Sequence, residues 1–338
     1  MDDKNISAVN NSHFFDNESN NEIYEINIPI LVIKIIFLIW ICGGNGLVIT
    51  AYLRYKELQT VANYWILHLA IADFSMGLQQ IVSLVVPFLQ AKPGNLLYKI
   101  FCAVITFSYD ISIFMSLVML VGVTVDRYVA VFWPLRYHDI MTYKRAKIAV
   151  CTIWAIVIGY SCISIIETGS RPATKLDCVP QYTAYLYILI FCLTSVIQII
   201  LYIHIFTVIH KQSKMIAHHE DIGTNHEDTS TNHETMSTKR KNMVILKTSV
   251  IVIGVFLLCW TPVTVLDGFF LWDKTATENL IIVSSFSYFQ LLAFGNSGIN
   301  PLIYSYRMKQ FRRAFCKLIR IKTNNLEASA CNPTDDNY

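Results

Sequence analysis

Seven long apolar stretches dominate this sequence and leave few folds open to it. They cover about residues 27–53, 61–90, 100–133, 147–166, 183–210, 243–270 and 279–306. Each is long enough for a helix that crosses the hydrocarbon core of a bilayer, which takes about 20 residues. The apolar runs are continuous and do not alternate with polar residues, which excludes a transmembrane β-barrel. The sequence therefore predicts an all-α membrane protein, with a seven-transmembrane helix bundle over residues 27–306.

Composition supports this prediction. Hydrophobic residues make up 54% of the chain and charged residues only 15%, whereas soluble domains carry roughly 25% charged residues. The net charge of +3 is too small to indicate a nucleic-acid partner. We therefore expect lipid to surround most of the chain and no nucleic acid to bind it.

The polar segments predict how the bundle is oriented. Residues 1–26 form a polar head that contains three glycosylation sequons, at Asn5, Asn10 and Asn17. Most Lys and Arg residues fall in segments on the opposite side of the membrane from this head, as expected for cytoplasmic loops. We therefore expect a multi-pass plasma-membrane protein with an extracellular amino terminus and a cytoplasmic carboxyl terminus.

Three cytoplasmic segments have distinct compositions. The polar loop at about 212–241 has two interpretations, a solvated linker with phosphorylatable Ser and Thr or a His/Glu metal or pH sensor. Residues 307–320 place Phe311 and Phe315 on one helical face and basic residues on the other, which predicts a short amphipathic eighth helix on the inner leaflet. Cys316 in this helix is placed for palmitoylation, and residues 321–338 form a cytoplasmic tail.

Two of the nine cysteines, Cys102 and Cys178, fall on the predicted extracellular side. Disulfides form and persist in oxidising compartments such as the cell exterior. We therefore expect these two residues to form a disulfide.

Specific polar and proline motifs lie inside the predicted spans. The second span carries Leu69-Ala70-Ile71-Ala72-Asp73, and the third ends in Asp126-Arg127-Tyr128. The sixth carries Phe256 and Cys259-Trp260-Thr261-Pro262, and the seventh carries Asn300-Pro301-Leu302-Ile303-Tyr304. With Asn45 in the first span and Trp154 in the fourth, this set resembles the signature of rhodopsin-like (class A) G-protein-coupled receptors over about residues 40–316.

The resemblance implies a polar core and an activation switch. The polar core would consist of Asn45, Asp73, Ser116, Asn296, Ser297 and Asn300. It would hold a sodium ion at Asp73 or, as the alternative, form a dry hydrogen-bonded network. The switch would consist of Asp126, Arg127, Tyr128, Tyr202, Phe256, Trp260, Pro262, Pro301 and Tyr304. Activation would move the sixth helix outward to admit a heterotrimeric G protein, with Leu135 contacting it, and arrestin and receptor kinases are further implied partners.

Two positions depart from the family pattern. Some relatives restrain the arginine of the third span with an acid at the base of the sixth, where this sequence has Asn242. We therefore expect measurable signalling without ligand. The proline that usually makes a bulge in the fifth span is replaced by Thr194.

The candidate ligand-binding residues match no single receptor group; they are Tyr109, Asp110, Ile113, Glu167, Trp260, Asp267 and Phe294. Amine receptors carry an aspartate at the position of Tyr109, one residue before Asp110. The purine-contacting Asn and His of adenosine receptors are replaced by Asp267 and Phe294, and residues 279–306 contain no lysine to bind retinal. Acids among aromatic rings favour a small cationic, amine-like ligand, and a basic peptide is the alternative.

A membrane transporter is the alternative from another functional class. It would be expected to show inverted repeats and broken helices at the midplane, which are not visible in the sequence. The sequence also lacks a phosphate-binding loop, a nucleophile–base pair and a metal-spaced His/Cys set, so we expect no enzymatic activity and no cofactor besides the sodium ion. Ligand-dependent nucleotide exchange on a G protein would distinguish a receptor from a transporter.

Overall fold

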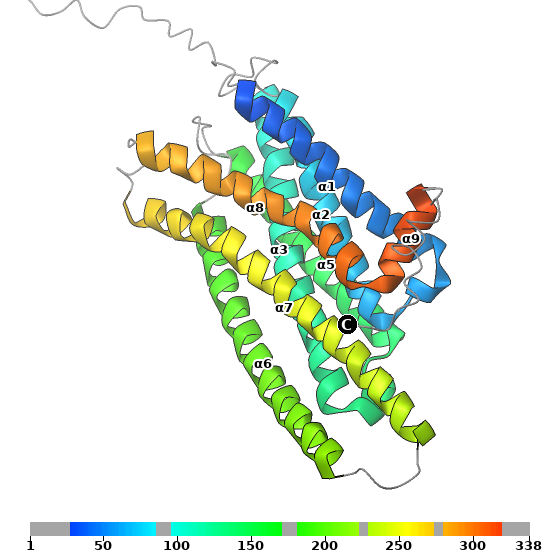
Figure 1. Cartoon of the computed structure of the whole chain (residues 1–338). Helices are drawn as coiled ribbons and strands as arrows, with labels where there is room; N and C mark the ends of the chain where they lie inside the picture. Colours follow the sequence, from blue (N-terminus) through cyan, green and yellow to red (C-terminus); the bar gives the residue numbers. More distant parts are fainter. Residues whose placement is uncertain (1–27, 86–95, 171–180, 223–228, 274–279, 320–338) are drawn as a thin grey trace, which may run out of the picture.

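The computed structural model of the chain is a bundle of long helices (Figure 1). It describes residues 28–85, 96–170, 181–222, 229–273 and 280–319, and no strand occurs within these ranges. The long helices are α1 (Ile28–Arg54), α2 (Val61–Val85), α3 (Leu96–Phe132), α5 (Tyr143–Ser170), α6 (Gln181–Ile222), α7 (Thr229–Trp272) and α8 (Leu280–Arg307). The short elements are η1 (Lys56–Leu58), η3 (Pro134–Arg136), α4 (Tyr137–Ile140) and α9 (Lys309–Ile319).

Six of the long helices, α1, α2, α3, α5, α6 and α7, are long and apolar enough to cross a membrane. The seventh, α8, has 28 residues, about 42 Å of helix at 1.5 Å per residue, which also exceeds the thickness of a bilayer core. Its hydropathy is lower because Gln290, Asn296 and Asn300 lie within it. The predicted all-α bundle is confirmed.

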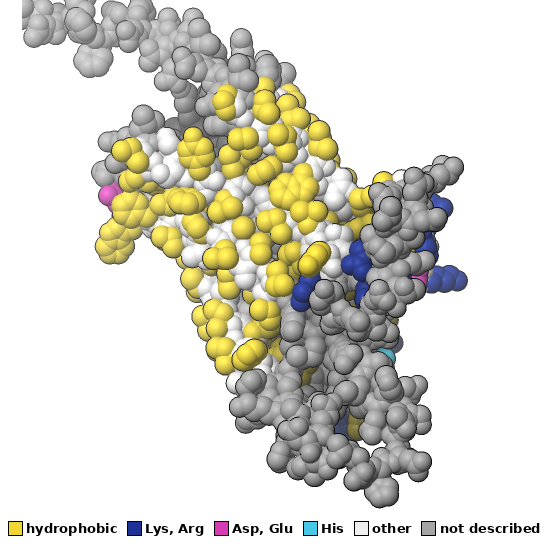
Figure 2. Space-filling view, in the orientation of Figure 1, with side chains coloured by type: hydrophobic (Ala, Val, Ile, Leu, Met, Phe, Trp, Pro, Cys, Tyr) yellow, Lys and Arg dark blue, Asp and Glu magenta, His cyan; other side chains and the backbone are white. Residues whose placement is uncertain are grey.

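The outer surface of the bundle is apolar. Figure 2 shows hydrophobic side chains covering the flank formed by α1, α7 and α8, with basic side chains gathered around α9. Large side chains such as Ile39, Ile156 and Leu258 are mostly exposed. A helix that is apolar all round is buried in protein on one side and in lipid on the other. The exposed apolar faces are therefore the lipid-facing surface.

Close packing joins α1 to α8 at two glycines. A Cβ atom placed on Gly44 of α1 would lie 3.0 Å from the ring of Pro301, and one on Gly298 of α8 would lie 2.8 Å from the Trp40 ring. A Cβ on Gly298 would force the Trp40 ring to shift, and one on Gly44 would require the Pro301 ring to give by a few tenths of an ångström. The two helices are thus in contact at the proline of α8 and about one turn before it.

The cytoplasmic loop predicted at 212–241 is shorter in the structure, because α6 continues to Ile222 and α7 begins at Thr229. Residues 223–228 lie outside the described part of the chain. The stretch contains no proline and only one glycine, Gly223, so little in the sequence ends either helix. Most of this segment is therefore helical and not irregular. Its assignment as a cytoplasmic loop between two spans stays a prediction.

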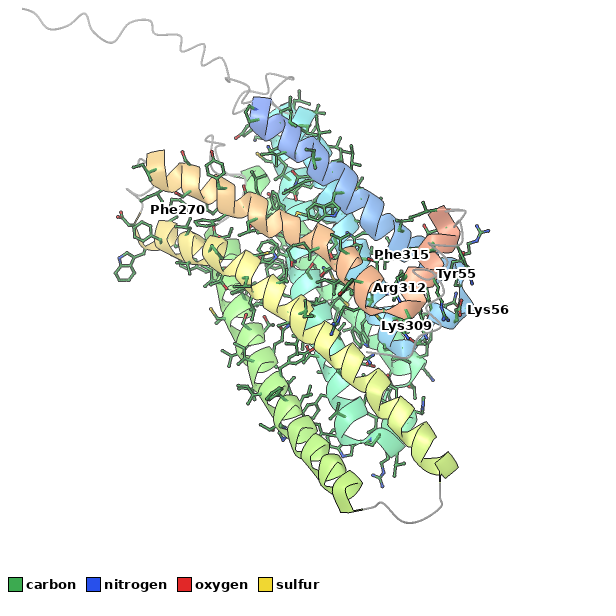
Figure 3. The ribbon with its side chains drawn as sticks, in the orientation of Figure 1. Tyr55, Lys56, Phe270, Lys309, Arg312 and Phe315 are labelled. Atoms are coloured by element: carbon green, nitrogen blue, oxygen red, sulfur yellow. The ribbon has the colours of Figure 1, made fainter. Side chains whose placement is uncertain are left out.

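Helix α9 confirms the predicted eighth helix, but its apolar face packs on protein instead of lipid. Phe311 is fully buried and Phe315 nearly so, and the Phe311 ring lies 5.8 Å from that of Tyr304 in α8. Figure 3 shows Phe315 and the other labelled side chains of α9 beside the segment that follows α1. There Lys317 lies over the ring of Tyr55. This anchors α9 to the bundle.

Thr194 stands where the family usually has a proline in the fifth span, and the helix is continuous there. The Thr194 hydroxyl donates hydrogen bonds to the carbonyl oxygens of Ile190 (2.7 Å) and Phe191 (3.2 Å). A proline would lack its backbone N–H and leave a carbonyl of the preceding turn unpaired. Threonine keeps the backbone donor, and α6 runs as one helix from Gln181 to Ile222.

Candidate functional site

The predicted polar core is assembled around Asp73, which is fully buried in α2. Ser116 of α3 donates a hydrogen bond to one carboxylate oxygen of Asp73 (3.4 Å). Asn300 of α8 donates one to the other oxygen (2.8 Å). The carboxylate therefore joins three helices in the middle of the bundle, where an unpaired charge would be very costly.

Asn45 extends this core to α1. Its side-chain amide donates hydrogen bonds to the backbone carbonyls of Ser297 (2.9 Å) and Ile41 (3.0 Å). The side-chain carbonyl oxygens of Asn45 and Asn296 are buried and accept no hydrogen bond. Buried acceptors without donors are sites for water or a cation.

The residues of the core fit a sodium ion in chemistry. They offer one carboxylate and several neutral oxygen atoms, the ligand type that hard cations prefer. Among the described residues, no group of three or more His, Cys, Asp or Glu side chains could hold a metal ion. A transition-metal site is thus not formed there, and a monovalent cation would rely on Asp73, Ser116 and the two asparagine oxygens.

Near the carboxyl-terminal end of α3, Arg127 is held by its neighbour Asp126. A guanidinium nitrogen of Arg127 lies 2.8 Å from a carboxylate oxygen of Asp126, whose side chain is almost fully buried. Tyr137 of α4 donates its hydroxyl proton to the other oxygen of Asp126 (2.9 Å). Burial, together with the Asp126 carboxylate, raises the pKa of Tyr137, so its hydroxyl remains a donor at neutral pH. Tyr137 was not predicted as a site residue.

Tyr128, the third residue of the same motif, contacts α6. Its hydroxyl lies 3.1 Å from Nδ1 of His204, and its ring stacks on Phe132 at 4.3 Å between centroids. The rings of Phe132 and His204 are 4.5 Å apart. These aromatic contacts join α3 to α6 beside Arg127, and the sequence analysis did not include His204.

A small cavity lies between the cytoplasmic halves of the helices. Its volume is about 30 Å³, and Leu69, Arg127, Ile253 and Tyr304 are among the residues that line it. The cavity is therefore far too small for a segment of a partner protein. Leu135 in η3 is 97% exposed and free to contact a partner outside it.

Aromatic rings are stacked next to the proline of α7. Trp260, two residues before Pro262, is almost fully buried, and its ring centroid is 6.1 Å from Phe256 and 6.4 Å from Tyr187 of α6. Proline inside a helix removes one backbone hydrogen bond and permits a bend at that point. The rings thus connect α6 to the part of α7 that can bend.

A hydrogen bond on the extracellular side of this stack also joins α6 to α7. The hydroxyls of Tyr187 and Thr264 are 2.7 Å apart, and Thr264 in turn donates to the backbone carbonyl of Trp260 (2.9 Å). Further out, the ring of Phe270 in α7 packs edge-on against Phe286 of α8 (5.3 Å; Figure 3). A ligand that contacts Tyr187 can therefore act on α7 through Thr264.

Two of the predicted ligand-binding acids lie in the outer half of the bundle. Asp267 of α7 is partly exposed and interacts electrostatically with the hydroxyls of Tyr109 and Tyr187. Asp110 of α3 is 1% exposed and has Ser164 of α5 as its polar neighbour. Neither acid forms an ion pair with a described residue. The helical step of about 100° between Tyr109 and Asp110 turns the latter toward α5.

The remaining predicted ligand-binding residues have different positions. Ile113 and Phe294 are buried in the hydrophobic core of the bundle. The side chain of Glu167 and the three glycosylation sequons lie outside the described residues. The side chain of Asn242, whose replacement of an acid predicts basal signalling, is likewise outside them.

The structure tests part of the predictions about the cysteines. Cys102 is disulfide-bonded, and its predicted partner Cys178 lies outside the described residues. Cys316 of α9 is also disulfide-bonded in the structure. One sulfur cannot carry a disulfide and a thioester together, so palmitoylation of Cys316 remains a prediction for the reduced thiol, the state that the cytosol maintains.

Comparison with known proteins agrees with this arrangement. Residues 44–304 match the family described as "7 transmembrane receptor (rhodopsin family)". The chain is 29% identical to the adenosine receptor A2a of Cavia porcellus, over 86% of this chain and 72% of the relative. It is 27% identical to the human adenosine receptor A2a, over 82% of this chain and 68% of the relative. The identity is 26% to the mouse adenosine receptor A2b, over 82% of this chain and 85% of that receptor.

Proposed function

Because this chain belongs to the rhodopsin family of seven-transmembrane receptors, we propose that it is activated by a small cationic, amine-like ligand. The family consists of membrane receptors that bind an extracellular ligand and act on heterotrimeric G proteins, and it is not a family of enzymes. The chemistry of the ligand goes beyond family membership. It is argued below from the outer half of the bundle.

The observation that carries the proposal is the environment of Asp267. This acid is partly exposed, interacts electrostatically with the hydroxyls of Tyr109 and Tyr187, and forms no ion pair with a described cation. An ammonium group placed there would gain an ion pair and contacts with aromatic rings. The carboxylate, as an acceptor without a donor, selects for a ligand that carries positive charge or several N–H groups.

The relatives are adenosine receptors, so adenosine is the second candidate. The asparagine that contacts the purine in that group has both a donor and an acceptor in its side chain. Asp267 has acceptors only when ionised, and the histidine position is occupied by the apolar Phe294. Both replacements remove hydrogen-bond donors from the site, which disfavours a neutral purine relative to a cation.

The proposed activation path starts at the ligand and ends at Arg127. A ligand bound between Asp267 and Tyr187 pulls on the hydrogen bond to Thr264 and shifts the Trp260 ring. Because Pro262 permits α7 to bend, the cytoplasmic end of α7 moves outward and enlarges the cavity that Arg127 lines. Arg127 then leaves Asp126 and becomes available to the G protein, with Leu135 contacting it from the loop.

We further propose that the polar core binds a sodium ion through Asp73, Ser116 and the unpaired side-chain oxygens of Asn45 and Asn296. The ion would supply positive charge that compensates the buried carboxylate. It would favour the packed arrangement of α2, α3 and α8, so that agonists would bind more weakly when it is present.

Several expectations from the sequence remain proposals. They are the extracellular amino terminus with glycosylated Asn5, Asn10 and Asn17, the plasma-membrane location, and contacts with inner-leaflet lipid. Binding of arrestin and receptor kinases is proposed on the same basis. A basic peptide remains the alternative ligand class.

Nucleotide exchange on G proteins, in membranes from cells that express the full chain, tests the proposal. Primary amines, adenosine and basic peptides are added in turn to the wild type and to Asp267→Asn. We expect amines to stimulate exchange and the isosteric Asp267→Asn change to reduce their potency by about a hundredfold, as for loss of a partly buried ion pair. The matched control is Asp273→Asn, near the outer end of α7. Stimulation by adenosine with no response to amines refutes the proposal.

A further inference from the structure

The outer half of the bundle contains a second carboxylate, Asp110, that the proposed function does not use. Its side chain is 1% exposed, and both of its oxygens are buried without a hydrogen-bond partner. Ser164 of α5 is the polar side chain that interacts with this carboxyl group. A buried carboxylate in this state is costly inside a membrane, and such groups usually take part in function.

The basic residues of the described outer half do not compensate this charge. Lys34 of α1 and Lys99 near the outer end of α3 form no ion pair with Asp110 or Asp267. Two carboxylates, both within electrostatic reach of Tyr109, therefore have no ion-pair partner among the described residues. A bound molecule that carries two positive charges would balance both.

The geometry of α3 determines how such a molecule would lie. Tyr109 interacts electrostatically with both acids and directly precedes Asp110 in α3. Because successive residues differ by about 100° around a helix, Asp110 turns toward α5, whereas Asp267 approaches from α7. A flexible apolar chain between two cationic groups would cross the Tyr109 ring and reach both acids.

We propose that the ligand is a bis-cation, with one ammonium bound by Asp267 and the other by Asp110 with Ser164. This inference rests on the proposed function, because it takes the cation at Asp267 as given. It adds the chemical class of the ligand, a diamine, and assigns Asp110 the role of selecting diamines over monoamines.

Matched ligand series test the inference on the full chain in cells. Linear alkylamines and α,ω-diaminoalkanes of equal carbon number are compared by G-protein activation in the wild type, Asp110→Asn, Asp267→Asn and the control Asp273→Asn. We expect diamines to be more potent by a factor of about ten to a hundred, the range for one added ion pair with partial desolvation. Asp110→Asn should bring diamines to the potency of monoamines and leave monoamines unchanged. That unchanged response also shows that the variant folds.

Each other outcome overturns a defined part of the argument. Equal potency of the two series in the wild type refutes the bis-cation and leaves the cationic ligand standing. An equal loss for both series in Asp110→Asn also refutes it, since the residue then acts only on packing. Silence of both series, in cells where Arg127→Ala abolishes basal signalling, overturns the cationic ligand and the bis-cation together.

Discussion

Tyr137 gives the sharpest test of the activation switch, because a single atom, its hydroxyl oxygen, forms the hydrogen bond to Asp126. Replacing Tyr137 by Phe removes only the hydroxyl that donates to the Asp126 carboxylate at 2.9 Å. Asp126 keeps its contact with Arg127 at 2.8 Å, but it loses the group that fixes its orientation. We expect the closed arrangement to weaken and signalling without ligand to rise.

The size of the effect follows from the burial of the pair. Hydrogen bonds to charged groups contribute about 1.5–3 kcal/mol to stability. The Asp126 side chain is 1% exposed and that of Arg127 is 13% exposed, so solvent screens the bond little. Water on the cytoplasmic side can replace part of it, which favours the lower limit, about 1.5 kcal/mol. That energy corresponds to about a tenfold increase in the ratio of open to closed receptor.

Basal nucleotide exchange per receptor at the cell surface measures this ratio. Tyr306→Phe is the matched control, because Tyr306 is 77% exposed and no hydrogen bond is formed by its hydroxyl among the described residues. Basal exchange that is unchanged or reduced in Tyr137→Phe, at equal surface expression, would refute the role of this bond. A rise of the same size in the control would do so as well.

Three further substitutions test the packing and the polar core. Gly122→Ala would place a Cβ 2.4 Å from the Trp65 ring, so we expect a loss of about 1–3 kcal/mol in stability, measured as a lower Tm in detergent. Gly159→Ala is the control, because no atom lies within 4 Å of its new Cβ, and it should not lower the Tm. Phe311→Ala removes a fully buried ring and should cost about 3–5 kcal/mol, so an unchanged Tm would contradict the anchoring of α9. In the wild type we expect agonist affinity to differ between a sodium buffer and a buffer with an organic cation of equal concentration. Asp73→Asn should abolish this difference, and a difference that persists in the variant would place the ion elsewhere.

The helices were predictable from sequence, whereas their cytoplasmic ends were not. Continuous apolar length is sufficient to identify a span, because the bilayer requires it. Between α6 and α7 the polar composition suggested a linker, but composition does not end a helix in water without a proline or glycine. In α9, the spacing of Phe311 and Phe315 revealed an apolar face. Spacing alone cannot distinguish a lipid partner from a protein partner.

Some of the site residues were likewise predictable from the sequence, and others were not. Asp73, Asn300 and Arg127 were identified because they stand in motifs that resemble those of rhodopsin-like receptors, and because a polar residue inside a membrane requires a partner. Tyr137 and His204 were missed, because each lies at the membrane edge, where a polar residue is ordinary. The weak signal for Tyr137 was its position in a short polar segment directly after the third span, one that folds back toward Asp126.

The glycine contacts between α1 and α8 restrict how the receptor can move. Pro301 lies against Gly44, and Trp40 lies against Gly298, so an added carbon at either position would force a neighbour to shift. Helix α8 therefore cannot move closer to α1 without displacing one of these side chains. Alanine at Gly44 would push directly on Pro301, the residue at which α8 lacks a backbone donor, so strain at this one contact would be passed to the inner end of α8.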